Sequence, residues 1–97
     1  MEYGLIGRFA VSKAGHDKDC MYVIVHKDDS YVYLSDGRYH PLDKTKKKAY
    51  KHVAICGECV EPGLQQRIIN KERVFDYEIK YAIKNQKSGK EEGYVKK

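Results

Sequence analysis

The chain has 97 residues, of which 41% are hydrophobic and 34% are charged, and its formal net charge is +5. This length suits one domain with a modest core and leaves too little core for a large enzyme pocket. The charge is uneven, because residues 38–53 hold six basic side chains and one acidic side chain. Such a basic segment indicates an anionic partner, either a nucleic acid or a membrane surface.

The first residues, MEYGLIGRFAV, lack a basic segment followed by a long apolar run, so we expect no signal peptide. No window approaches eighteen apolar residues, so we expect no transmembrane helix. The three cysteines are an odd number in a chain without an export signal. This pattern favours a reducing cytosol and hence a cytoplasmic protein.

The first half of the chain predicts short strands joined by tight turns. Asp36-Gly37 is a strong signal for a two-residue hairpin turn, because both turn positions need positive φ. Five short strands in such an arrangement predict a small antiparallel barrel, and closing the barrel removes exposed edges. The expected strands are residues 7–12, 21–27, 31–35, 38–42 and 49–56.

Beyond Pro62 the pattern becomes helical. The segments PGLQQRIIN and DYEIKYAIKNQ place apolar residues at helical spacing, and Asp76 suits the N-cap of the second segment. We expect two short helices or one broken helix, with an apolar face on the barrel. The sequence thus divides into a barrel (1–56), a helical extension (57–86) and a flexible charged tail (87–97).

Four segments of the first half carry a family resemblance: GRFAVSKAGHDK, YVIV, DDSYVYLSDGRYHPL and KKKAYKHV. Together, residues 4–53 resemble the KOW-domain proteins related to ribosomal protein fourteen of the archaeal and eukaryotic large subunit, with weaker similarity in DYEIKYAIK. Small bacterial members of that group are described as RNA-binding. The resemblance implies a mainly β fold, a five-stranded SH3-like antiparallel barrel of KOW type, here with a short helical C-terminal extension. It also implies that the loop after the first strand faces RNA or, in some relatives, protein.

One residue departs from the family pattern. The family has a glycine directly after the Asp-Lys pair, where this chain has Asp19. Glycine suits a left-handed backbone, and aspartate tolerates that region better than most residues but at a cost. We therefore expect an altered geometry of this loop.

Two basic segments are candidate RNA contacts. In the loop after the first strand, lysines can neutralise phosphates and His16 can bind a phosphate or stack on an unpaired base. The segment KTKKKAYK holds five lysines in eight residues, which suit the phosphate backbone. The alternatives are a solvated turn in which Asp17 and Asp19 pair with neighbouring lysines, and a solvated linker. The predicted RNA-binding residues are Lys13, His16, Lys18, Arg38, Lys44, Lys46, Lys47, Lys48, Tyr50 and Lys51.

The tyrosines of the first half are a further candidate surface. Alternation places Tyr31 and Tyr33 on the face opposite Val32 and Leu34. If the aliphatic pair is buried, the tyrosines face outward, where bases can stack on them. The alternative is that several tyrosines fill or border the core.

Cys56 and Cys59 form a single CxxC, which supplies half of a tetrahedral zinc shell. His52, with Cys20 or His16, would have to complete it, and the spacing matches no standard zinc ribbon. Two thiols without a metal are the favoured interpretation. We therefore expect no cofactor and no metal, with Cys56, Cys59 and His52 as weak candidates.

The sequence contains no motif typical of metalloproteases, nucleotide phosphate loops or dinucleotide sites, so we expect no enzymatic activity and no small-molecule substrate. The favoured function is binding of structured RNA, most plausibly ribosomal, through its phosphates and shape. Ribosomal proteins are further candidate partners, and a membrane is not. Two alternatives remain open: an SH3-like protein-interaction module without RNA contact, and a metal- or redox-switched domain that uses Cys56 and Cys59.

Overall fold

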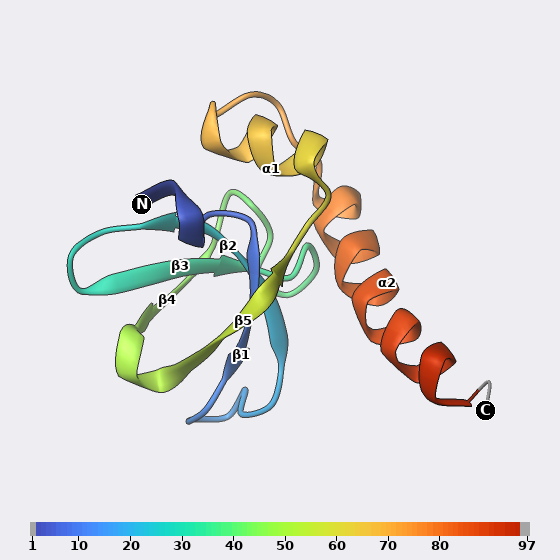
Figure 1. The fold of residues 1–97 in the computed structure, drawn as a ribbon. Coiled ribbons are helices and arrows are strands. Elements are labelled where there is room, and N and C mark those ends of the chain that lie inside the picture. Colours follow the sequence, from blue (N-terminus) through green and yellow to red (C-terminus); the bar gives the residue numbers. More distant parts are fainter. Residues whose placement is uncertain (1, 96–97) are drawn as a thin grey trace.

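The computed structural model describes the backbone of residues 2–95 and the side chains of residues 4–87. The fold is mainly β, with one five-stranded antiparallel sheet and two helices (Figure 1). The strands are β1 (Arg8–Ser12), β2 (Met21–Lys27), β3 (Tyr31–Ser35), β4 (Lys46–Ala49) and β5 (Val53–Cys59). The helices are α1 (Pro62–Ile69) and α2 (Asp76–Val95), and two 3-10 turns are η1 (Glu2–Leu5) and η2 (Tyr50–His52).

The strand order across the sheet is β4-β3-β2-β1-β5. The two edge strands, β4 and β5, are consecutive in the sequence and are joined by the three residues of η2. The sheet therefore curls so that its two ends approach each other at η2 (Figure 1). No ladder of hydrogen bonds joins β4 to β5 across the described residues, and the sheet stays open.

One hydrophobic core unites the sheet with both helices. Strand alternation buries Val32 and Leu34 of β3, and β2 is buried at three successive residues, Tyr22 to Ile24. These side chains are shielded from water, which is the main favourable contribution to folding. Both helices cover the sheet with aliphatic side chains at helical spacing, namely Leu64, Ile68, Ile79 and Ile83.

The predicted strand at residues 38–42 is wrong. Asp36 Oδ1 accepts hydrogen bonds from the backbone N–H groups of Arg38 (2.9 Å) and His40 (2.8 Å), and Gly37 has φ of +72°. Because an aspartate that binds the following N–H groups favours a local turn, this segment becomes an irregular loop. The fourth strand is formed instead by the lysines of β4, which pair with β3.

The last predicted strand also differs from the observed one. The expected strand 49–56 is divided among β4, which ends at Ala49, η2 and β5, and β5 runs to Cys59. Helix α2 continues to Val95, into the segment 87–97 that was expected to be a flexible tail. Residues 96 and 97 lie outside the described residues.

Asp76 begins α2, where the sequence predicted a helix cap. Its Oδ1 accepts a hydrogen bond from the backbone N–H of Leu42 at 2.7 Å, so it joins the β3–β4 loop to the helix.

Within the described residues, neither helix combines the length and the apolar character needed to cross a membrane.

Candidate nucleic-acid interface

The loop between β1 and β2, residues 13–20, is closed by backbone hydrogen bonds. Ser12 N–H donates to Cys20 O (3.0 Å), and Asp19 N–H donates to Ser12 O (2.8 Å). Asp19 has φ of +75°, so it adopts the left-handed backbone conformation that glycine favours. The loop thus has the backbone conformation that the glycine would favour.

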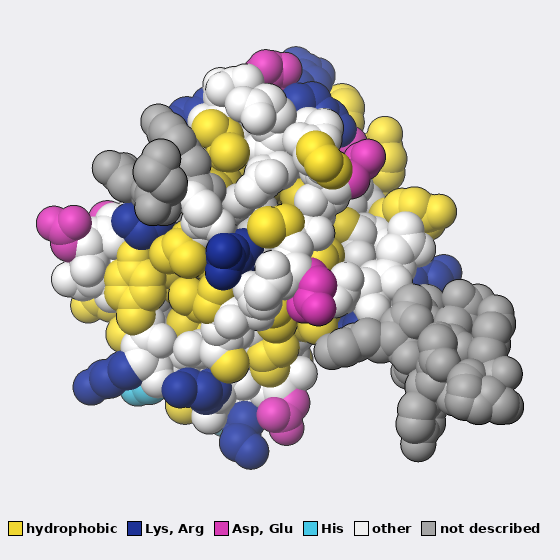
Figure 2. Space-filling view, in the orientation of Figure 1, with side chains coloured by type: hydrophobic (Ala, Val, Ile, Leu, Met, Phe, Trp, Pro, Cys, Tyr) yellow, Lys and Arg dark blue, Asp and Glu magenta, His cyan; other side chains and the backbone are white. Residues whose placement is uncertain are grey.

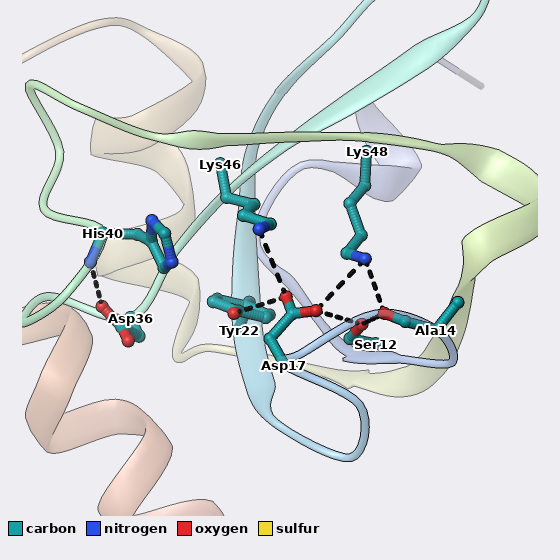
Figure 3. Close-up of polar contacts among 8 residues, drawn as sticks. All are labelled: Ser12, Ala14, Asp17, Tyr22, Asp36, His40, Lys46 and Lys48. Carbon is teal, nitrogen blue, oxygen red and sulfur yellow. Dashed lines mark hydrogen bonds and ion pairs between the residues drawn. The ribbon is translucent and has the colours of Figure 1, made fainter.

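The carboxylate of Asp17 ties this loop to three strands (Figure 3). Its Oδ1 accepts hydrogen bonds from Ser12 Oγ at 3.0 Å and Lys48 Nζ at 3.2 Å. Its Oδ2 accepts one from Tyr22 Oη at 2.8 Å and lies 3.9 Å from Lys46 Nζ. The side chain is only 12% exposed, so Asp17 is a mostly buried anion surrounded by donors.

The donors keep Asp17 charged. Partial burial would raise the pKa of this carboxyl, but hydrogen bonds from Tyr22 and Ser12, followed by the contribution of Lys48, lower the pKa to about 2. Burial, followed by the hydrogen bond to Asp17, raises the pKa of the Tyr22 phenol. At neutral pH the charged carboxylate of Asp17 in the loop therefore accepts from the neutral phenol of Tyr22 in β2.

Two of the predicted RNA-binding lysines point into this network. Lys48 is 10% exposed, and besides Asp17 its Nζ donates to Ala14 O at 2.8 Å. Lys46 is 34% exposed and reaches the same carboxylate. The alternative interpretation of the sequence, that Asp17 pairs with lysines, thus describes these two residues, although they come from β4 rather than from the loop.

The remaining basic groups of the loop face solvent and meet those of η2. Lys13, His16 and Lys18 are exposed, and Lys13 N–H donates to His52 O at 2.8 Å, which places η2 beside the loop. Figure 2 shows basic side chains spaced along the lower edge of the molecule, over the loop and η2, and others over α1. We call the surface at the loop and η2 the basic rim; its residues are Lys13, His16, Lys18, Lys51 and His52. From the sequence, His52 was a candidate only as a metal ligand, because its position beside the loop depends on the tertiary fold.

Lys47 lies on the opposite face of β4 from its neighbours in sequence. Its Nζ is 4.4 Å from the ring centroid of Tyr31, a distance typical of a cation–π contact. Tyr31 and Tyr33 face outward, as predicted, because Val32 and Leu34 are fully buried. Tyr33 packs against His26 with 5.1 Å between ring centroids, and its hydroxyl donates to Asp28.

The other predicted residues lie in two further places. Arg38 and Lys44 are exposed in the β3–β4 loop, where the Arg38 guanidinium lies 4.9 Å from the ring centroid of Tyr39. Tyr50 is half-buried against the core, and its hydroxyl donates to Asp28 O at 2.7 Å. The predicted set therefore divides between the basic rim, the Asp17 network (Lys46 and Lys48), the outer face of β4 (Lys47), the β3–β4 loop, and Tyr50 against the core.

The cysteines are not gathered into a metal centre. Cys56 packs against the core within β5, and Cys59 is exposed at the end of that strand, with Gln65 Nε2 at 3.9 Å from its Sγ. Across the described part of the chain, no group of three or more His, Cys, Asp and Glu side chains has a geometry that could hold a metal ion.

A scan of the chain against protein-family models and a search of curated proteins both found no match. The KOW resemblance thus stays a prediction that rests on the segments quoted above.

Proposed function

We propose that this protein binds structured RNA, with ribosomal RNA as the proposed target, and that it contacts the phosphate backbone of that RNA. The observation that carries the proposal is the basic rim, where exposed lysines and histidines of the β1–β2 loop and η2 lie side by side. Lysine is a mobile point charge that suits phosphate oxygens, and A-form RNA hides its base edges in a deep groove. A protein of this kind therefore recognises phosphates and shape.

The Asp17 network supports this function although it neutralises charge. It holds the loop in one conformation, so that Lys13 and Lys18 do not lose loop entropy when they bind an anion. In this proposal Lys46 and Lys48 act as internal supports of the loop. The phosphate contacts belong to Lys13, Lys18 and Lys51, with His16 and His52 as additional donors.

We also propose that the curled sheet is an SH3-like barrel of KOW type. Its strand order supports this assignment, since β1 lies between β2 and β5 and a three-residue 3-10 turn joins the two edge strands. The loop that carries the basic rim follows the first strand, which is the segment that the family resemblance assigns to RNA. We propose that the protein acts in the cytoplasm, either as a component of the ribosome or as a factor in ribosome assembly or translation. Its proposed protein partners are ribosomal proteins, and we propose no catalytic role.

The decisive experiment titrates a labelled RNA hairpin with protein over a range of salt concentrations. For wild type, the logarithm of the affinity should fall with the logarithm of salt by about 0.7–0.9 per phosphate contact. The variant Lys13→Glu/Lys18→Glu should bind more weakly and with a slope that is shallower by about 1.4–1.8, since it removes two phosphate contacts.

The matched control is Lys27→Glu/Lys71→Glu, which changes the net charge equally. Both lysines line a hollow at the opposite end of β2 from the β1–β2 loop. This control should bind nearly as wild type. Equal weakening by both variants would show that only total charge matters, and unchanged binding by the first variant would remove the basic rim from the proposal.

Association with ribosomes is tested by sedimentation of the tagged protein from lysate, before and after RNase treatment. Comigration with ribosomal particles that RNase abolishes is the expected result. A protein partner that survives RNase would support the interaction-module alternative instead.

A further inference from the structure

Helix α2 presents two opposite faces. Ile79 and Ile83 are buried against the sheet, at 0% and 8% exposure. Another face carries Tyr77, Lys80, Tyr81 and Lys84, whose spacing of three and four residues places them in one row. Tyr77 and Tyr81 are 68% and 63% exposed, and the four side chains line an open groove of about 440 Å³.

The β3–β4 loop packs against the start of the same helix. Gly37 lies directly against the first turn of α2, since a Cβ added to it would lie 2.3 Å from Asp76 O and 2.8 Å from Lys80 N. The next two residues of the loop are Arg38 and Tyr39, and the Tyr39 ring is 73% exposed with the Arg38 guanidinium beside it. A second ring with a cation therefore lies next to the start of the helix.

The segment before α2 adds a third such pair. Phe75 is 46% exposed and stacks on Tyr77 with 5.7 Å between ring centroids and an angle of 13°. The Arg73 guanidinium lies 5.8 Å from the Phe75 centroid. We call the rings of Tyr39, Phe75, Tyr77 and Tyr81, with the cations that accompany them, the aromatic–basic stripe.

Three carboxylates close to these rings in the sequence, Asp36, Asp76 and Glu78, already have partners, and Asp43 of the loop is exposed. Asp36 accepts from the backbone N–H groups of Arg38 and His40, and Asp76 accepts from that of Leu42. Glu78 forms an ion pair with Arg67, which together with a backbone hydrogen bond from Phe75 lowers the pKa of Glu78. Lys80 and Lys84 therefore remain available to an anion outside the protein.

We propose that the aromatic–basic stripe binds unpaired bases of an RNA strand, with the rings stacking on bases and the lysines and arginines holding the phosphates between them. This inference rests on the proposed function and adds a contact of a different kind. The basic rim suits a phosphate backbone, whereas exposed rings need bases that are free of a duplex. Every base has a π-face, so such stacking is tolerant of sequence.

The alternation of lysine with tyrosine favours RNA over a protein partner. The centres of protein–protein interfaces are enriched in aromatic residues but depleted in lysine. Single-stranded nucleic-acid sites, by contrast, combine a positively charged path with rings on which successive bases stack. The charge of the stripe is thus complementary to a polyanion.

The test uses two probes, a labelled single-stranded oligomer of ten adenosines and a labelled hairpin with a fully paired stem. Tyr77→Ala/Tyr81→Ala should lose at least about tenfold in affinity for the oligomer and stay within about twofold for the hairpin. Tyr77→Phe/Tyr81→Phe keeps both rings and should bind both probes as wild type. Both tyrosines are exposed, and circular dichroism will verify that each variant is folded.

Each other outcome decides against the inference. If Tyr77→Ala/Tyr81→Ala binds the oligomer as wild type while the hairpin still binds through the basic rim, the stripe is not an RNA site and the proposed function survives. If wild type binds neither probe, both proposals fail. If wild type self-associates and the alanine variant is monomeric with oligomer binding intact, a second copy of the chain occupies the stripe.

Discussion

Among single residues, Asp17 has the largest influence on the candidate interface. It lies in a loop whose other side chains mostly face water, yet its own side chain is 12% exposed and accepts from Ser12, Tyr22 and Lys48. A buried carboxylate is stable only when donors or cations surround it. The same residue therefore neutralises part of the basic surface and holds the rest of it in place.

Asp17 should make the stability of the protein depend on pH in the acid range. Its folded-state pKa of about 2 lies below the ordinary value of 3.8, so the stabilisation is fully present above about pH 5 and is lost as the pH falls through about 2. The gap corresponds to about 2 kcal/mol of unfolding free energy. Urea unfolding between pH 7 and 2 should show this loss in wild type and a smaller loss in Asp17→Asn. Exposed Asp43 gives the control Asp43→Asn, and an Asp17→Asn variant as acid-sensitive as wild type would contradict the prediction.

Lys47 and Lys48 are neighbours in sequence with opposite roles. Lys48→Ala removes two hydrogen bonds and leaves Asp17 with fewer partners, so it should lower the unfolding free energy by about 1–3 kcal/mol. Lys47→Ala removes an exposed contact with Tyr31 and should cost about 0.5–1 kcal/mol. Urea denaturation at pH 7 measures both. Equal costs would mean that Lys48 does not support the loop.

At the scale of elements, the sequence predicted those strands whose residues favour strand structure locally and which also pair with a neighbour in the folded sheet. The observed β1, β2 and β3 match the predicted segments to within one residue, because β-branched and aromatic residues alternate there between turns. The strand β4 was missed because lysine has a low preference for strands. It forms because β3 offers a free edge and because Lys46 and Lys48 reach Asp17, a partner about thirty residues earlier in the chain.

The sequence predicted which segments contribute basic residues to the candidate site, but it did not predict how those segments contact one another. The lysine-rich segment and the loop after the first strand were both identified, but their contact through Asp17 depends on the tertiary fold. The sequence did not indicate the α2 part of the aromatic–basic stripe, because the helical periodicity of this segment identifies its apolar face and leaves the exposed Tyr77 and Tyr81 without a predicted role. The i, i+4 spacing of two tyrosines next to two lysines was the signal that could have indicated it.

Gly37 determines how the β3–β4 loop meets α2. Its φ is +72° and a Cβ would clash with backbone atoms of Asp76 and Lys80, so Gly37→Ala should destabilise the protein by on the order of 2–4 kcal/mol. The control Gly57→Ala adds a methyl group where no heavy atom lies within 4 Å, and it should change the stability by less than about 1 kcal/mol. Chemical denaturation measures both, and the amide signal of Leu42 should shift only in Gly37→Ala. A Gly37→Ala variant as stable as the control would show that the loop does not pack on the helix.

For the whole molecule, the helices belong to the same core as the sheet. The sequence predicted helices with an apolar face against the strands, and Leu64 and Ile68 of α1 and Ile79 and Ile83 of α2 do join the buried residues of the sheet in one cluster. A chain of 97 residues buries too little surface to support two independent cores. The basic rim and the aromatic–basic stripe are thus carried by one cooperative unit.

This shared core predicts a single unfolding transition. Circular dichroism, which reports mainly on the helices, and tyrosine fluorescence, which reports on both the strands and α2, should give the same midpoint on heating. Ile79→Ala should remove about 2–5 kcal/mol, because this side chain is fully buried, and should shift both midpoints equally. Exposed Tyr81 lies two residues away on the same helix, and Tyr81→Ala should leave both midpoints nearly unchanged. A shift of the helical signal alone in Ile79→Ala would mean that α2 unfolds independently, and the stripe would then not share a fixed geometry with the basic rim.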